Sequence, residues 1–144
     1  MIVNIGLGLI LLGAAFFGYR SFAAQESIPR FNGEILACEG RPNCISTAGP
    51  DAFLAVPWQL KGSFDGIKDF IKGQEPQIVT DQENYLHVVF RSRIFQYPDD
   101  VVLKKNGDQI LFRSSSRVGY SDMGVNKKRM QGYEIKFRQL GLIQ

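Results

Sequence analysis

The chain has 144 residues, of which 44% are apolar and 22% are charged. These proportions exclude a disordered or low-complexity protein, and the length is that of one ordinary domain. The 17 basic and 14 acidic residues leave a net charge of +3, which is too small to favour a nucleic acid as a partner. One His and two Cys exclude most zinc sites, which take four nitrogen or sulfur ligands. We expect no metal and no other cofactor.

The amino end predicts a membrane anchor. No side chain between Met1 and Tyr19 is charged, and nineteen helical residues extend about 28 Å, close to the thickness of a bilayer core. A cleaved signal peptide is the alternative, but no Lys or Arg precedes the apolar run, as such a peptide would require. We therefore expect a single-pass transmembrane helix over residues 1–20 in contact with membrane lipid. A linker over residues 21–33 and one domain over residues 34–144 follow.

The first part of the domain is rich in residues that interrupt regular structure. Pro42, Gly49, Pro50 and Pro57 lie within twenty residues, and this density predicts a loop. Beyond it, Ser63 is placed to cap a short helix that ends at Gly73. Apolar residues share one face of this predicted helix: Phe64, Ile67, Phe70 and Ile71.

Alternating apolar residues predict four strands, over residues 77–80, 85–95, 101–105 and 109–116. Asn106-Gly107-Asp108 separates the last two strands and predicts a hairpin, because Asn-Gly readily adopts positive φ. A second helix is expected over residues 126–140, with Lys127, Lys128, Lys136 and Arg138 on its polar face. That face is either an ordinary solvated surface or a surface for anionic headgroups. Together these elements predict an α+β fold with two helices covering an antiparallel sheet.

Cys38 and Cys44 enclose five residues, with Gly40 and Pro42 available to turn the chain between them. They are either a structural disulfide or two free thiols of a cytosolic domain. Beside a membrane anchor we favour the disulfide, which places the domain on the periplasmic or other extracytoplasmic side. The anchor also predicts that the protein is a single-pass membrane protein.

The segment from Arg113 to Arg129 is polar where a strand core would normally hold Val or Ile. In an extended strand Arg113, Ser115 and Arg117 share one face, and Ser114 and Ser116 the other. One hypothesis is an anion site at the start of the following helix. Its candidate binding residues are Arg113, Ser115, Arg117, Tyr120, Asp122, Asn126 and Arg129. The other is structural, with Arg117 paired to Asp99 or Asp100 and Asp122 or Asn126 capping the helix.

This segment also carries a family resemblance. The run Arg113–Arg129, preceded by Pro42-Asn43-Cys44, Tyr85-Leu86-His87 and Asp99-Asp100, resembles the domain-of-unknown-function family 1499 over about residues 35–135. The resemblance implies a bacterial or plastid origin, often with a membrane or lipid anchor, and it implies no known activity. One departure is Pro98, directly before the aspartate pair, where the family has an aromatic-rich stretch.

We found no nucleophile elbow, Walker loop or dinucleotide fingerprint. The leading hypothesis is therefore a membrane-anchored accessory or interaction subunit of the cell envelope, without enzymatic activity and with a membrane protein as partner. The alternative is an anion- or small-molecule-binding domain, with or without enzymatic activity, built on residues 113–129.

Overall fold

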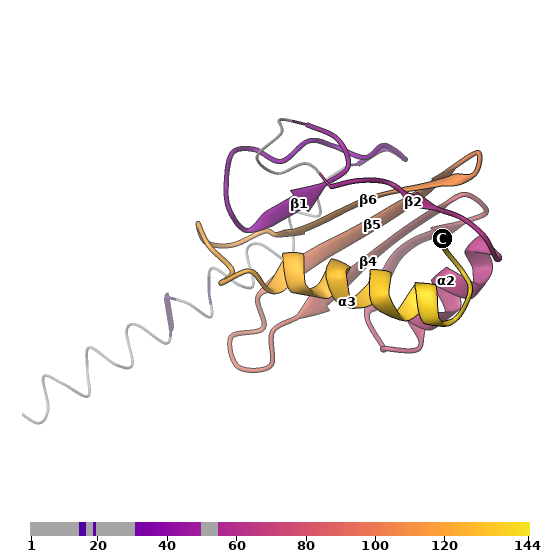
Figure 1. Cartoon of the computed structure of the whole chain (residues 1–144). Coiled ribbons are helices and arrows are strands. Elements are labelled where there is room, and N and C mark those ends of the chain that lie inside the picture. Colours follow the sequence, from indigo (N-terminus) through magenta and orange to yellow (C-terminus); the bar gives the residue numbers. More distant parts are fainter. Residues whose placement is uncertain (1–14, 17–18, 20–30, 50–54) are drawn as a thin grey trace, which may run out of the picture.

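The computed structural model describes residues 15–16, 19, 31–49 and 55–144. Its centre is an antiparallel sheet in which the strands lie in the order β1-β6-β5-β4-β3, and β2 pairs with β6 beside β1. The strands are β1 (Cys44–Ser46), β2 (Trp58–Gln59), β3 (Gln77–Gln82), β4 (Tyr85–Arg91), β5 (Pro98–Asn106) and β6 (Gln109–Ser116). Two helices, α2 (Phe64–Lys72) and α3 (Val125–Gln139), lie against the sheet (Figure 1). The predicted α+β architecture is confirmed.

Helix α2 begins where the sequence predicts it. The hydroxyl of Ser63 accepts a hydrogen bond of 2.9 Å from the backbone N–H of Gly66, which satisfies one of the free donors of the first turn. Phe64, Ile67 and Ile71 are buried because their spacing places them on one side of the helix. The helix ends at Gly73, whose N–H bonds to the carbonyl of Asp69.

Both helices cover the same face of the sheet. Their apolar side chains form one core with the strand residues that point toward them. The buried members are Trp58, Phe64, Ile67, Ile71, Leu86, Val88, Val101, Leu103, Ile110, Phe112, Met130, Tyr133, Phe137 and Ile143. Phe70 and Phe90 pack against this core while partly exposed. We call this side the helix face and the other side the open face.

The strand predictions differ from the structure at several points. Strand β3 extends to Gln82, β5 begins at Pro98 and not at residue 101, and the two-residue β2 was not expected. Strand β4 ends at Arg91, four residues earlier than expected, because the chain turns back and the N–H of Ser92 bonds to the carbonyl of Tyr97. The region between Cys38 and Pro57 is not all loop, since it contains β1. That strand has three residues and is held by pairing with Ser115, Ser114 and Arg113 of β6, a long-range partner that local sequence does not reveal.

The hairpin between β5 and β6 is confirmed. Asn106 pairs with Gln109, so the loop consists of Gly107 and Asp108. Gly107 has a φ of 58°, and positive φ at the first loop position is the pattern of a type II′ turn, which takes Gly there. The turn brings the long β6 strand back along β5 and so fixes which β6 residues face Asp99 and Asp100.

A smaller cluster covers part of the open face. Phe31 is 3% exposed and packs with Tyr85 and Val102, with Ile35 at its edge. The folded part of the chain therefore includes Phe31, three residues before the expected domain boundary at residue 34. The remainder of the expected linker, residues 21–30, lies outside the described residues.

The predicted transmembrane helix over residues 1–20 lies outside the described part of the chain, except at Ala15, Phe16 and Tyr19. In the described part, no helix combines the length and the apolar character that crossing a bilayer requires.

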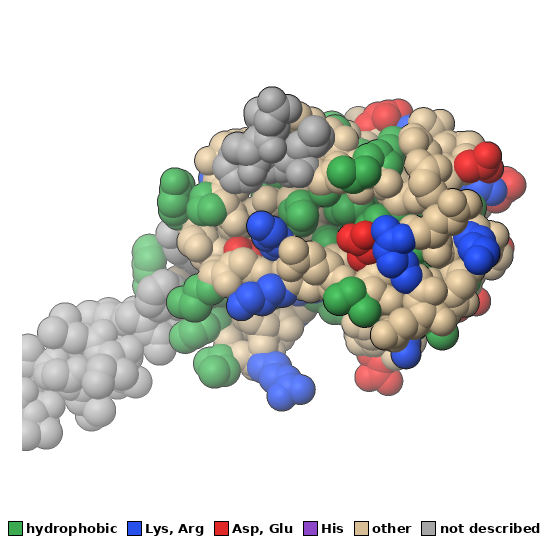
Figure 2. All heavy atoms as spheres, viewed as in Figure 1, with side chains coloured by type: hydrophobic (Ala, Val, Ile, Leu, Met, Phe, Trp, Pro, Cys, Tyr) green, Lys and Arg blue, Asp and Glu red, His purple; other side chains and the backbone are tan. Residues whose placement is uncertain are grey.

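A groove of about 430 Å³ lies between α3 and the edge of the sheet formed by β1 and β2. Buried Trp58, Phe112 and Met130 line it, together with Glu134 and Arg138 at the surface of α3. Figure 2 shows hydrophobic side chains at the bottom of a hollow above α3.

Candidate functional site

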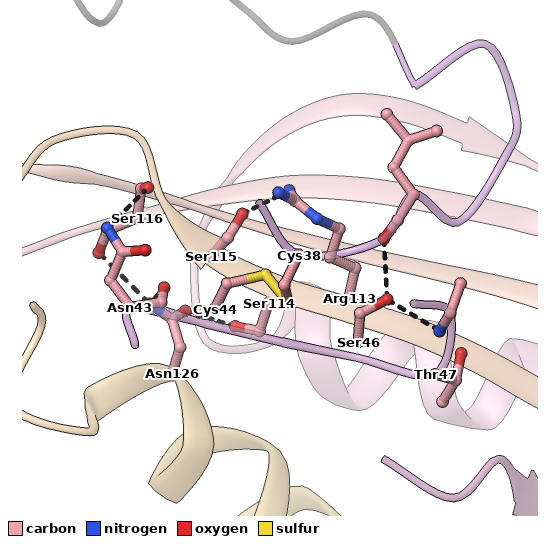
Figure 3. Close-up of a disulfide and its surroundings, with 12 residues drawn as sticks. Cys38, Asn43, Cys44, Ser46, Thr47, Arg113, Ser114, Ser115, Ser116 and Asn126 are labelled. Carbon is pink, nitrogen blue, oxygen red and sulfur yellow. Dashed lines mark hydrogen bonds between the residues drawn. A yellow bond between two sulfur atoms is a disulfide. The ribbon is translucent and has the colours of Figure 1, made fainter. Parts of the chain in front are cut away.

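The seven candidate residues do not converge on one point. Three of them, Arg113, Ser115 and Arg117, lie on the open face of the sheet, whereas Asn126 and Arg129 belong to α3 on the other face. Ser114 and Ser116 also point toward α3. Figure 3 shows Arg113 beside Ser115 on β6, with Asn126 of α3 near Ser114. A single anion held by all seven residues is thus excluded by their placement.

On the open face, Asp100 is the centre of a buried ionic group. Arg117 donates two hydrogen bonds of 2.7 Å to the two carboxylate oxygens, from Nε and Nη2. His87 Nε2 lies 2.6 Å from Oδ1 of the same carboxylate. The side chains of Asp100, Arg117 and His87 are 1%, 4% and 4% exposed. The structural pairing proposed for Arg117 is therefore made with Asp100.

The charges of this group shift neighbouring pKa values. Burial by itself would raise the pKa of Asp100, but the hydrogen bonds from Arg117 and His87 outweigh burial and hold the pKa below its usual range. Burial, with smaller contributions from the charges of Asp100 and Glu34, raises the pKa of Tyr85 to about 12. Asp100 is thus ionised at neutral pH, and its Oδ1 accepts a hydrogen bond from Nε2–H of His87.

Arg113 lies on the same face but has a different environment. Its Nη1 donates a hydrogen bond of 2.5 Å to the hydroxyl of Ser115, and its guanidinium lies 5.2 Å from the centre of the Phe31 ring. The Nε atom is buried and has no hydrogen-bond partner within the described residues. Burial lowers the pKa of Arg113, against the opposing effect of Asp100 and Glu39. An arginine in this state retains donor capacity for an acceptor.

On the helix face, Asp99 pairs with Arg129 of α3. Nη2 of Arg129 donates a hydrogen bond of 2.8 Å to Oδ2, and Ser116 donates its hydroxyl proton to Oδ1. The guanidinium of Arg129 also lies 5.0 Å from the centre of the Phe90 ring. Oδ1 of the buried Asn126 accepts two hydrogen bonds, one from the hydroxyl of Ser114 at 2.5 Å and one from Nη1 of Arg129 at 2.6 Å. These bonds fix the start of α3 to β5 and β6.

Asp122 satisfies the first turn of α3. Its Oδ1 accepts a hydrogen bond from the N–H of Gly124 at 2.9 Å, and its Oδ2 accepts one from the N–H of Asn126 at 2.7 Å. Of the two predicted capping residues, Asp122 therefore bonds the free donors, although Gly124 occupies the capping position itself. Tyr120, in the same loop, is 72% exposed.

Cys38 and Cys44 form the predicted disulfide. The loop that it closes carries Asn43, whose side chain donates a hydrogen bond of 2.9 Å to the carbonyl of Gly119. In addition, the N–H of Ser116 bonds to the carbonyl of Asn43. The disulfide loop thus holds the end of β6 and the segment that follows it.

A pocket of about 210 Å³ opens at the amino end of α3. Its walls come from the turn after β4, the ends of β5 and β6, and the loop before α3. The lining residues are Ser92, Tyr97, Asp99, Ser116, Val118, Gly119, Ser121, Asp122 and Val125. Of the predicted binding residues, Asp122 therefore reaches this pocket, whereas Arg113, Ser115 and Arg117 lie on the other face.

Pro98 does not disturb the aspartate pair. It is the first residue of β5, opposite Arg91, and its carbonyl accepts a hydrogen bond of 3.0 Å from the N–H of Arg117. Proline is tolerated at the first residue of a strand. The departure from the family pattern therefore leaves Asp99 and Asp100 in regular strand positions.

The candidate set omitted three polar partners. Two of them are Ser114 and Ser116, which form hydrogen bonds with Asn126 on the helix face. The alternation along the strand already places both on the face opposite Arg113, and this was the signal for a second polar network. His87, the third, bonds to Asp100 on the open face.

Among the described residues, no group of three or more His, Cys, Asp or Glu side chains is arranged to hold a metal ion. A search of curated proteins finds no match to the chain, and no solved structure matches it. The family model described as "Protein of unknown function (DUF1499)" matches residues 34–137. That range covers the sheet, α2, the polar network and all but the last two residues of α3. The chain therefore belongs to the DUF1499 family.

Proposed function

We propose that the chain is a membrane-anchored accessory protein whose domain binds a partner on the extracytoplasmic side and does not itself catalyse a reaction. The observation that carries the proposal is the internal pairing of the motif. Arg117 and His87 are committed to Asp100, and Arg129 and Ser116 are committed to Asp99. Groups that stabilise each other in this way maintain the shape of the domain and are not held ready for a substrate.

Two further features support the location. The Cys38–Cys44 disulfide is of a kind that persists in oxidising compartments. The uncharged run from Met1 to Tyr19 has the length of a bilayer span. Phe31 belongs to the fold, so ten residues at most separate the proposed anchor from the domain, which corresponds to no more than about 35 Å of chain.

The test is the state of the full-length chain in its own membranes. After gentle detergent extraction, we expect a particle larger than the monomer, with a companion in fixed stoichiometry that remains after chemical crosslinking. The matched control replaces residues 1–20 by a cleavable leader, and it should leave the membrane fraction. Protease added outside spheroplasts should degrade the domain of the anchored protein. A solitary monomer would contradict the accessory role, and protection from protease would contradict the location.

A second candidate function is supported by one observation. Arg113 has a buried Nε without a partner in the described part of the chain, and its other bond is to Ser115. This favours binding of a small oxyanion or carboxylate at the open face. Sulfate or phosphate should then raise the melting temperature of the wild type but not that of Arg113→Gln, and Lys127→Gln should respond like the wild type. Equal responses from all three proteins would reject this candidate.

A further inference from the structure

Two loops form one end of the molecule. The turn over residues 92–97 and the segment over residues 118–128 line opposite sides of the same pocket, with Ser92 and Tyr97 on one wall and Val118, Gly119 and Val125 on the other. In Figure 1 both loops lie at the end of the sheet where α3 begins. We refer to residues 92–97 and 118–128 together as the tip.

The tip exposes large hydrophobic side chains. Ile94 is 83% exposed, Phe95 55%, Tyr120 72% and Met123 89%. Val125 is also exposed. Single exposed apolar residues are common on proteins, but a group of them on neighbouring loops is typical of a surface that binds a protein or a membrane.

Exposed basic side chains lie in the same two segments. Arg93 lies in the first loop, and Lys127 and Lys128 lie in the first turn of α3, all exposed. Asp122 is the acidic residue of the tip, and its oxygens accept hydrogen bonds from the N–H groups of Gly124 and Asn126. Three basic residues and one acidic residue leave the tip with a charge of +2. Figure 2 shows hydrophobic side chains beside Lys and Arg side chains at this end.

We propose that the tip is a membrane-contact surface, in which Ile94, Phe95, Tyr120 and Met123 enter the headgroup region of a bilayer while Arg93, Lys127 and Lys128 bind anionic lipid. Tyr is enriched at the membrane–water interface, and Phe is among the apolar residues with which interfacial segments enter the bilayer surface. Clustered Lys and Arg side chains complement its negative charge. The polar network behind the tip fixes the two loops, since Asp99, Ser116 and Asn126 join β5, β6 and α3.

This inference extends the proposed anchoring, because it gives the domain a second contact and hence an orientation on the membrane. A surface for a protein partner is the competing occupant. The charge of the tip and the chemistry of its exposed side chains favour the lipid, whose surface requires no shape complementarity.

Tryptophan fluorescence in vesicles tests the tip directly. The natural Trp58 is 3% exposed and supplies a constant background. Phe95→Trp and Tyr120→Trp introduce reporters at the tip, and Val56→Trp introduces one at a position that is 81% exposed outside it. Each full-length variant is added to vesicles with bromine in the acyl chains, made of phosphatidylcholine alone or with phosphatidylglycerol.

We expect strong quenching and a blue shift for the two tip reporters in phosphatidylglycerol vesicles, and neither effect for Val56→Trp. Adding Lys127→Gln and Lys128→Gln should weaken the quenching titration about tenfold or more, since each basic residue near an anionic surface contributes a factor of about five. Unquenched tip reporters on membrane-bound protein would overturn the proposal, and so would equal quenching of Val56→Trp. Tip reporters that are shielded in native membranes but unquenched in vesicles would assign the surface to a protein.

Sedimentation separates this proposal from the anchor. One outcome is that the chain does not sediment with pure phosphatidylcholine vesicles but its tip reporters are quenched with phosphatidylglycerol. The tip contact is then present without the anchor. A chain that sediments with both lipids and shows no quenching has the anchor without the tip contact.

Discussion

Asp99 and Asp100 are neighbours on β5 and each pairs with an arginine, but they do so on opposite faces of the sheet. On the open face the side chains of Asp100 and Arg117 are 1% and 4% exposed, and two hydrogen bonds join them. On the helix face the side chains of Asp99 and Arg129 are 10% and 16% exposed, and one hydrogen bond joins them beside an open pocket. The two Asp–Arg pairs should therefore contribute differently to stability, because the contribution of an ion pair depends on how deeply it is buried.

The largest expected effect is on the open face. Arg117→Ala should lower the free energy of unfolding by about 3–5 kcal/mol, because it leaves the Asp100 carboxylate buried with His87 alone. Urea unfolding of the wild type and the variant measures this difference. Replacing both partners, with Arg117→Met and Asp100→Leu, should cost less than the single change. A single variant within about 1 kcal/mol of the wild type would contradict the assigned role.

Acid should reduce the contribution of the Asp100 carboxylate to the stability of the fold. The pKa of Asp100 is lowered on folding, so its contribution to stability is complete above the unfolded pKa of about 3.9 and is lost as the pH falls through that value toward the folded pKa. Asp100→Asn should therefore be less stable than the wild type at pH 7 but lose less stability between about pH 5 and pH 2. Asp81, whose pKa is lowered by Lys68 and Lys72, keeps some acid sensitivity in both proteins. Parallel pH profiles would contradict the prediction.

Removal of the disulfide should have an intermediate effect. Cys38→Ser with Cys44→Ser opens a short loop, for which chain entropy predicts a loss of about 2–3 kcal/mol. The loss should also loosen the end of β6, because Asn43 in the disulfide loop bonds to the carbonyl of Gly119 and accepts a hydrogen bond from the N–H of Ser116. Chemical denaturation gives the stability, and alkylation of the unreduced wild type should add no label. Labelling of both cysteines in the wild type would reject the disulfide.

Arg129→Ala tests the Asp99 pair on the helix face against the Asp100 pair on the open face. We expect a loss of about 1–2 kcal/mol, smaller than for Arg117→Ala, because water reaches Asp99 through its 10% exposed side chain and Ser116 still donates to it. The same unfolding assay measures it. A loss equal to that of Arg117→Ala would remove the distinction between the two faces.

Ser63→Ala is the reference for both faces, since Ser63 caps α2 away from the two aspartates. The loss of one capping bond should cost about 1 kcal/mol. The effect should be independent of pH, in contrast to that of Asp100→Asn. A pH-dependent effect would show that the acid profile reports on the whole domain and not on Asp100.

The elements that local sequence specifies were predictable. Ser63 and Gly73 bound α2, and the turn signal at residues 106–108 predicts the hairpin, so α2, β6 and the carboxyl end of β5 follow from short-range signals. The three-residue β1 and two-residue β2 were not predictable, because pairing with β6 creates them. The predicted β4 is four residues too long, because Ile94 continues the alternation of apolar and polar residues although the chain turns at Ser92.

The candidate site was predictable in its parts but not in its arrangement. The alternation of Arg113, Ser114 and Ser115 indicates two faces. The choice of Asp100 as the partner of Arg117 depends on the register between β5 and β6, which places Asp100 opposite Ser115. That register follows from the tertiary fold, and so does the position of His87 against the same carboxylate.

The most direct test of the account is a double-mutant cycle of Arg117 and Asp100, measured by urea unfolding at pH 7 with and without sulfate. If the pair maintains the fold, Arg117→Ala and Asp100→Ala should each be strongly destabilising, their combined effect should fall short of the sum by about 2–3 kcal/mol, and sulfate should not restore the loss. If the motif is instead a ligand site at Arg117, the two changes should be additive and small, and sulfate should stabilise the wild type but not Arg117→Ala. That second outcome would contradict the account.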